Sequence, residues 1–264
     1  MSTEVLPVRH TGFGNAVNDT LTMIGRSIRL TRRNVETLLM SIALPLLMMA
    51  LFVYVFGGAI ETGTAYINYV VPGIILLCAG FGASQTAVSV AHDMEHGMID
   101  RLRSMPIRSF AVLTGHVTAS LARNSLATAI VFATAVLMGF RPNATALDWL
   151  LAVLVLALYI LAFSWLAAAI GVAAKSVESA SAMTFFMMFL PYLSSAFVPT
   201  DTMPLVLRVF SENQPITPII ETVRGLLTGT PIGSSGWLAV AWAGGLFLAA
   251  FAWATWLFRR KTSR

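Results

Sequence analysis

The sequence predicts an all-α integral membrane protein with six transmembrane helices, on the evidence of its composition, its apolar runs and the positions of its basic residues. Of the 264 residues, 57% are hydrophobic and only 11% are charged, whereas soluble domains carry about a quarter charged residues. The mean hydropathy is +0.78, and the apolar residues extend along the whole chain. The formal net charge of +5 arises from basic residues between apolar runs. We therefore expect this charge to orient the chain in a membrane, and we expect no nucleic-acid partner.

Six apolar runs have roughly the 20 residues needed to cross about 30 Å of hydrocarbon. They lie near residues 37–57, 69–91, 111–139, 149–171, 179–198 and 237–258. Pro45 predicts a kink in the first run. The third run is longer than a bilayer is thick, so we expect it to extend into the cytoplasm, with Arg123 near its inner end, where a long side chain can reach the interface. Residues 1–264 are thus interpreted as a single transmembrane domain.

The basic residues between the runs predict the orientation of the chain. One side of the membrane receives most of them: Arg9, Arg26, Arg29, Arg32, Arg33, Arg101, Arg103, Arg108, Lys175, Arg259, Arg260, Lys261 and Arg264. The other side receives only Arg141, Arg208 and Arg224. This asymmetry places both termini in the cytoplasm and the protein in the plasma or inner membrane.

Residues 16–34, before the first run, have the pattern of an amphipathic helix. Apolar and basic side chains fall on opposite helical faces: Val17, Leu21, Ile24 and Ile28 on one, and Arg26, Arg29 and Arg33 on the other. Such a helix is typical of the inner membrane surface, with its arginines near anionic lipid. The alternative is a solvated helix that packs on a soluble neighbour.

A second segment, residues 199–235, lies between the fifth and sixth runs on the outer side. It contains two apolar stretches, 205–210 and 216–227, and neither is long enough to span a bilayer. Gln214-Pro215 separates the stretches and Gly229 ends the second. The pattern predicts two short interfacial or re-entrant helices.

The cytoplasmic loop 92–108 begins with a spacing that some zinc proteases use. In "HDMEHGMIDRLRSMP", His92 and His96 are four residues apart and Glu95 stands between them, so both histidines would share one face of a helix. Catalytic zinc usually needs three protein ligands. Neither His10 nor His116 is placed as an obvious third ligand, and short motifs of this kind often arise by chance, so we do not favour a protease.

The same loop suits a docking role. The predicted spans carry no carboxylate or histidine clearly at mid-depth, which weakens an ion-coupled carrier, although sodium coupling can use carbonyls and hydroxyls. Energy would then come from a separate subunit through a cytoplasmic element. A short helix that presents Met98, Ile99 and Leu102 within a charged rim could occupy a partner's groove. An ordinary solvated loop is the alternative.

Two motifs resemble those of type-2 ATP-binding-cassette (ABC) exporter permeases, and within them the daunorubicin-resistance type. The first cytoplasmic loop of that family is matched in order by Asp93, Glu95, Gly97, Asp100, Arg101, Leu102 and Pro106. The stretch after the fifth span is matched by Phe197, Pro199, Met203, Pro204, Pro215, Pro218, Arg224, Leu226 and Gly229. Gln214 stands where the family has an asparagine-like turn. The resemblance covers nearly the whole chain.

The resemblance implies a permease subunit that is not itself an enzyme. It would pair with a second copy of itself, and two copies of a separate ATPase subunit would bind ATP and magnesium; this chain would hold no cofactor and no metal. Loop 92–108 would be the coupling helix, with Met98 and Ile99 among its contacts, and ATP would bias a two-state interface that moves substrate outward.

The substrate is expected to be a hydrophobic or amphipathic drug, antibiotic or lipid. Methionine and aromatic side chains form adaptable apolar surfaces, and the fifth span and its approach carry several: Met183, Phe185, Phe186, Met187, Met188, Phe189, Tyr192 and Phe197. Ser84 and Gln85 add a polar patch in the second span. Both groups are candidates for a substrate path, and packing or lipid contact is the alternative. A lipid-linked glycan or polysaccharide remains an alternative substrate.

Overall fold

The computed structural model describes residues 35–60, 62–97 and 109–262. All regular secondary structure within these ranges is helical. The elements are α2 (Val35–Ala50), η1 (Leu51–Phe56), α3 (Tyr66–Glu95), α5 (Ser109–Leu137), α6 (Ala146–Ala173), α7 (Val177–Phe189), η2 (Leu190–Leu193), η3 (Thr200–Thr202), α8 (Leu205–Asn213), α9 (Ile216–Thr228) and α10 (Ser235–Thr262).

Four of these helices are long and apolar enough to cross a membrane: α3, α5, α6 and α10. Two shorter apolar helical stretches, Ser41–Phe56 and Val177–Leu193, lie where the first and fifth spans are expected. The first contains Pro45 and changes from α-helix to a π-helical turn at Leu51. The fifth leaves the α-helix at Phe189 and closes with a 3₁₀ turn at Leu193, five residues before the predicted end of the span at residue 198.

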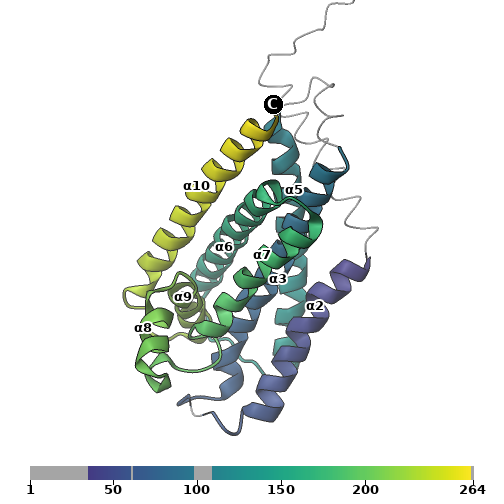
Figure 1. Cartoon of the computed structure of the whole chain (residues 1–264). Helices are drawn as coiled ribbons and strands as arrows, with labels where there is room; N and C mark the ends of the chain where they lie inside the picture. Colours follow the sequence, from purple (N-terminus) through teal and green to yellow (C-terminus); the bar gives the residue numbers. More distant parts are fainter. Residues whose placement is uncertain (1–34, 61, 98–108, 263–264) are drawn as a thin grey trace, which may run out of the picture.

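The long helices form one bundle with α3 at its centre (Figure 1). Every residue of α3 from Val70 to Gly80 is buried, because α5, α6 and α7 all pack against this helix, while α10 packs mainly on α6. The largest fully buried side chains include Tyr159, Phe163 and Phe140. Burial on all sides explains why α3 is apolar around its whole circumference.

Local signals in the sequence explain where several helices begin and end. The hydroxyl of Thr145 accepts from the backbone N–H of Asp148, while the Asp148 carboxylate accepts from the backbone N–H of Thr145 at 2.9 Å, so a capping box starts α6. Ser176 and Ser179 form the same reciprocal arrangement at the start of α7. Gly229 ends α9 with a φ of +72°, a left-handed conformation that glycine adopts without steric cost.

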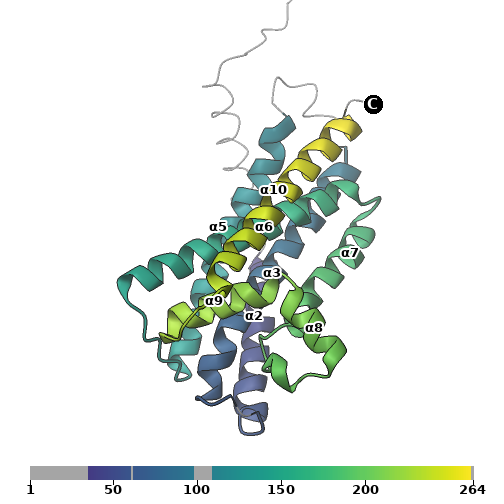
Figure 2. The ribbon, with the colours of Figure 1, turned by 90° about the vertical axis from the view of Figure 1, so that its left-hand side faces the viewer.

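The bundle has two distinct ends. We call the end where α3 and α10 finish the C-terminal end, and the opposite end the α8–α9 end (Figure 1). The two short helices α8 and α9 begin at the residues where the sequence predicts short helical stretches. Figure 2 shows that α9 lies crosswise to α2 and α3. Its buried residues include Ile216, Ile219 and Ile220, so α9 is part of the core, whereas only Ser211 of α8 is buried.

Candidate functional site

The C-terminal end of the bundle carries the first part of the predicted coupling loop. Asp93 and Glu95 occupy the last turn of α3, and Gly97 follows with a φ of +63°. The other predicted coupling residues lie outside the described residues: Met98, Ile99, Asp100, Arg101, Leu102 and Pro106. Arg26, Arg29 and Arg33 of the predicted interfacial helix also lie outside them.

Asp93 joins α3 to α5 on either side of this loop. Its Oδ2 lies 3.1 Å from Nε2 of His116, and the two side chains are only 14% and 11% exposed. Hydrogen bonds that involve an ionised group and are shielded from water are stronger than neutral, exposed ones. The end of α3 and the start of α5 are therefore held together where the loop leaves and re-enters the bundle.

Glu95 joins α3 to α7 at the same end. Its Oε2 accepts from the backbone N–H of Val177 at 3.4 Å, and Val177 is the first residue of α7. A carboxylate is favourable at a helix N-terminus because the first N–H groups there lack partners within the helix. At the same end of the bundle, Lys261 of α10 binds the last carbonyl groups of α6. Its Nζ donates to the carbonyls of Ala173 and Ala174 at 3.4 and 3.3 Å. The residues before the predicted coupling loop thus contact two other helices, α5 through Asp93 and α7 through Glu95.

The two histidines of the apparent zinc motif lie on one helical face, as their spacing predicts. The rings of His92 and His96 stack with centroids 4.0 Å apart, and Nδ1 of His96 lies 3.0 Å from the carbonyl oxygen of His92. In residues 35–60, 62–97 and 109–262, no group of three or more histidine, cysteine or acidic side chains could hold a metal ion.

The predicted aromatic substrate path forms a continuous row of rings. Ring centroids are 4.7 Å apart between Phe185 and Phe189, 5.9 Å between Phe189 and Tyr192, and 5.2 Å between Tyr192 and Phe197. Phe197 also stacks on Phe52 of η1 at 4.2 Å. The row therefore joins α7 to the end of the first apolar helix. We call these five residues the aromatic row.

Exposure differs along and beside the aromatic row. Phe186, next to the row on α7, is 75% exposed, and Phe185 and Phe189 are 54% and 45% exposed, whereas Phe197 is buried. The α7 end of the row is therefore open to lipid, to a second chain or to a substrate. The polar candidates are more enclosed. Ser84 is buried and donates to the carbonyl of Phe81 in its own helix at 2.7 Å, and Gln85 is half-buried.

At the α8–α9 end, Arg224 connects α9 to two other elements. Its Nε donates to the carbonyl of Tyr69 at 3.1 Å, and one Nη donates to the carbonyl of Ser195 at 2.6 Å. Tyr66 adds a hydrogen bond from its hydroxyl to the carbonyl of Phe197 at 2.8 Å. The turn after α7 is thereby fixed to the start of α3.

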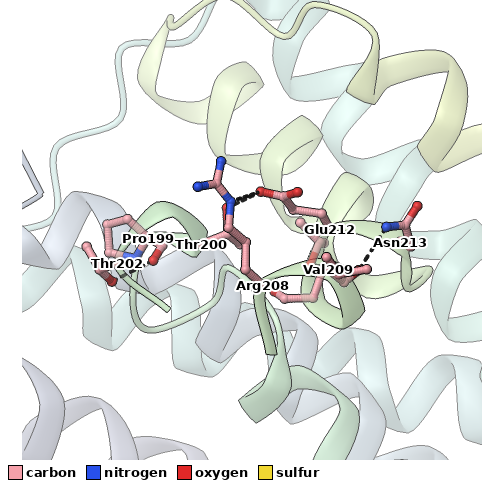
Figure 3. Close-up of polar contacts among 9 residues, drawn as sticks. Pro199, Thr200, Thr202, Arg208, Val209, Glu212 and Asn213 are labelled. Carbon is pink, nitrogen blue, oxygen red and sulfur yellow. Dashed lines mark hydrogen bonds and ion pairs between the residues drawn. The ribbon is translucent and has the colours of Figure 1, made fainter. Parts of the chain in front are cut away.

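The exposed helix α8 has its own local contacts, which Figure 3 shows. Nε of Arg208 lies 2.9 Å from Oε1 of Glu212 one turn later, and Nδ2 of Asn213 donates to the carbonyl of Val209 at 2.8 Å. Before this helix, the 3₁₀ turn η3 is stabilised by its last residue, Thr202, whose hydroxyl donates to the carbonyl of Pro199 at 2.8 Å. The apolar side chains of α8 nevertheless remain exposed: Leu205, Val206, Leu207, Val209 and Phe210.

Three long-range side-chain contacts were not predicted from the sequence. Arg224 was interpreted as an outer-side charge and as part of the motif after the fifth span, with no partner assigned, and His116 only as a histidine not placed to be a third zinc ligand. Arg123 was expected to reach toward the inner interface, but its Nη2 donates to the carbonyl of Gly82 at 3.0 Å and to the hydroxyl of Thr86 at 3.4 Å, both on α3. In each case the partner lies 23 or more residues away, so no local pattern identifies it.

The chain is similar to known transport permeases over most of its length. Residues 18–228 match the family described as ABC-2 type transporter. A daunorubicin resistance ABC transporter permease protein, DrrB1 of Streptomyces coeruleorubidus, is 29% identical over 217 residues, which cover 81% of this chain and 77% of that protein. A probable doxorubicin resistance ABC transporter permease protein, DrrC of Mycobacterium tuberculosis, is 26% identical over 255 residues, 92% of this chain and 90% of its own length.

A third relative is the inner membrane transport permease YadH of Escherichia coli K12, which is 27% identical over 188 residues, 68% of this chain and 72% of its own length. The matched region includes the predicted coupling loop, the aromatic row and the helix α9 that Arg224 holds in place. It also includes three of the four helices long enough to cross a membrane. The chain therefore belongs to the ABC-2 type transporter family, as a multi-pass membrane permease.

Proposed function

We propose that this chain is the membrane subunit of an exporter that moves a hydrophobic or amphipathic substrate outward, driven by a separate ATPase subunit that docks on loop 92–108. The observation that carries the proposal is the arrangement at the C-terminal end of the bundle. The residues on both sides of the loop are joined to each other through Asp93 and His116, and to α7 through Glu95.

This arrangement supports a route for mechanical coupling. A force on the loop acts first on the end of α3, and Glu95 passes it to the first turn of α7. At the other end of α7 lies the aromatic row, which reaches Phe52 of η1. A partner that shifts the loop can therefore shift α7 as a unit. Transport needs two discrete arrangements of such an element, with ATP favouring one of them.

We further propose that the exposed face of α7 meets a second copy of the chain, so that two aromatic rows border one path. Support comes from the exposure of Phe185, Phe186 and Phe189 and from the tendency of aromatic side chains to occupy interfaces. A path bordered by methionine and phenylalanine would suit an amphipathic drug or a lipid. The relatives named for daunorubicin and doxorubicin resistance favour a drug over a glycan.

At the α8–α9 end, we propose that α8 lies at the non-cytoplasmic interface of the membrane and that α9 enters the membrane from that side. Both termini of the chain would then lie in the cytoplasm. The exposed apolar side chains of α8 and its Arg208–Glu212 pair suit a location between lipid tails and water. The burial of α9 suits a re-entrant helix, because the polar backbone groups at the ends of such a helix must be shielded from lipid by the surrounding protein.

The deciding experiment is affinity purification of the full chain from its native membrane, followed by reconstitution with and without the soluble subunit that accompanies it. We expect an ATPase to co-purify, and we expect the chain alone to be inert in sealed vesicles. Replacing Asp100 and Arg101 with alanine should abolish both binding of the ATPase and drug-stimulated ATP hydrolysis, whereas replacing Arg208, which lies at the α8–α9 end, should leave both unchanged.

Two results would contradict the proposal. Transport by the chain alone under an ion gradient would instead indicate an ion-coupled carrier. An ATPase that binds and is stimulated equally well by the Asp100→Ala, Arg101→Ala chain would mean that docking takes place elsewhere.

A further inference from the structure

The proposal concerns a positive charge inside the bundle. Arg123 lies halfway along α5, a helix apolar enough to cross a membrane. Its guanidinium donates to the carbonyl of Gly82 and the hydroxyl of Thr86, and both acceptors lie on the central helix α3. The charge is therefore held at the α3–α5 interface and is not directed along α5 toward a polar end.

The part of the chain that the structure describes offers this charge no anionic partner. The ion pairs among the described residues join His92 and His116 to Asp93, and Arg208 to Glu212; none of them involves Arg123. The two acceptors of Arg123 are neutral, and Nε of Arg123 is buried without any acceptor among the described residues. A charge shielded from water is costly unless it is paired, and ionisable side chains within membrane helices typically mark substrate or ion pathways.

Further polar atoms lie on the same stretch of α5. Nδ2 of Asn124 donates to Oγ of Ser120 at 3.2 Å, and Ser120 shares a hydrogen bond of 2.9 Å with Ser164 of α6. Oδ1 of Asn124 is buried without a donor among the described residues. A polar cluster thus connects α3, α5 and α6 at the level of Arg123, and it has both an unused donor and an unused acceptor.

Arg123 itself is half-buried, and one side of α5 next to it is exposed. On α5, Ala122 and Ser125 flank Arg123 and are exposed, and Leu126, one turn further on, is 52% exposed. A molecule that moves within the membrane can therefore approach the guanidinium along α5. Only an amphiphile fits such a route, because its chain stays in the hydrocarbon while its head meets the charge.

We propose that Arg123 binds the anionic head group, a phosphate or carboxylate, of an amphiphile within the membrane. The planar guanidinium binds such groups through two parallel N–H···O bonds, which an ammonium cannot reproduce. Nη2 already donates to Gly82 and Thr86, so the donors left for this contact are Nη1 and, once the ligand reaches it, the buried Nε. The amphiphile is either a lipid of the surrounding bilayer or a transported molecule; the binding step itself does not depend on the export proposed above.

The test is ligand binding to the purified full chain without any ATPase, measured by native mass spectrometry. Two anionic probes, phosphatidylglycerol and dodecyl phosphate, are compared with two probes that carry no net charge, phosphatidylcholine and dodecyl maltoside. The variants are Arg123→Gln and Arg123→Lys. The matched control is Arg141→Gln, which removes an arginine just after the C-terminal end of α5.

We expect Arg123→Gln to weaken binding of the anionic probes about tenfold, Arg123→Lys to weaken it less, and Arg141→Gln to change nothing. An effect on phosphatidylglycerol alone identifies a bilayer lipid as the ligand, and an effect on dodecyl phosphate alone identifies a transported amphiphile. Unchanged binding of both anionic probes in Arg123→Gln overturns the proposal.

A second measurement uses only the unmodified chain and so remains informative if the Arg123 variants do not fold. Dodecyl phosphate or phosphatidylglycerol should raise the thermal midpoint of the unmodified chain more than the matched uncharged probe does, because a ligand that binds only the folded state stabilises it. Equal shifts for the charged and uncharged probes would overturn the proposal without recourse to any variant.

Discussion

The guanidinium carbon of Arg224 lies 3.8 Å from the centre of the Tyr69 ring, while Nε of Arg224 donates to the carbonyl of that same tyrosine. One arginine thus contacts both the ring and the backbone of one residue of α3, and also reaches Ser195 in the turn after α7. This contact fixes α9 relative to the central helix, although the two elements are far apart in the sequence.

Replacing Arg224 with methionine should destabilise the protein by about 2 to 4 kcal/mol, because the substitution removes two charge-assisted hydrogen bonds and a cation–π contact. Thermal unfolding in detergent measures the effect. Arg208→Met is the matched control, since its pair with Glu212 is about half exposed and such pairs contribute at most about 1 kcal/mol. Equal losses for the two variants would mean that the Arg224 contacts do not stabilise the fold.

Gly82→Ala should destabilise the protein by about 1 to 3 kcal/mol, as overpacking of a close contact usually does. A Cβ at this position would lie 1.4 Å from Oδ1 of Asn124, so α3 and α5 would have to separate. Gly245→Ala is the control: this residue lies in α10 and has nothing within 4 Å of the added Cβ, so we expect no loss and a gain of up to about 1 kcal/mol from helix propensity.

The Gly82 prediction also has a rescue. Asn124→Ala removes the clashing amide, so adding Gly82→Ala to an Asn124→Ala chain should cost less than adding it to the original chain. A double-mutant cycle on thermal stability gives the difference. A strictly additive pair would show that the Gly82–Asn124 contact does not decide how closely the two helices approach.

His116→Ala should reduce coupling between ATP hydrolysis and transport without preventing the ATPase from binding. The variant removes the link from Asp93 to α5, so the end of α3 can move without carrying α5. The ratio of substrate transported to ATP hydrolysed, in vesicles that contain both subunits, measures coupling. His92→Ala serves as the comparison because His92 is 59% exposed and its Nδ1 is 4.0 Å from the Asp93 carboxylate; we expect its ratio to stay near that of the original chain.

Cysteine at position 186 should form an intermolecular disulfide if α7 meets a second copy. Cys78 is fully buried, so it does not compete for the oxidant in the folded protein. In native membranes we expect Phe186→Cys to give a covalent dimer on mild oxidation. Leu154→Cys, on the exposed face of α6 and itself 55% exposed, should remain monomeric. The reverse pattern would assign the dimer contact to α6 and would separate the aromatic row from the interface.

The long helices follow directly from the length of the apolar runs, because a helix that satisfies its own backbone hydrogen bonds is favoured wherever such a run must be buried. Their ends depend on local chemistry. The capping boxes at Thr145 and Ser176 can be found in the sequence. The early end of α7 at Phe189 is harder to anticipate, because the chain continues as a 3₁₀ turn from Leu190, in which Pro191 accepts a hydrogen bond from the hydroxyl of Ser194.

The candidate site is predictable only in part. The charged end of α3 can be identified because Asp93 and Glu95 directly follow an apolar run. Their partners cannot, because His116 and Val177 reach them only through the packing of three helices. Arg123 illustrates the same limit: periodicity gives its position on α5, but the direction of its guanidinium depends on Gly82, whose missing side chain lets Asn124 approach.

The short fifth helix also affects the membrane around it. The 13 residues of α7 rise about 20 Å at 1.5 Å per residue, and the 4 residues of η2 add about 8 Å at the 3₁₀ rise of about 2 Å per residue. This length is slightly less than the hydrocarbon core of a typical bilayer, which is about 30 Å thick. Where α7 spans the membrane and faces lipid outside the proposed dimer contact, the bilayer would thin slightly, at a cost of fractions of a kcal/mol for each ångström of mismatch. Acyl-chain length consequently becomes a variable that acts on this protein, and membranes of shorter lipids should accommodate it with the least deformation.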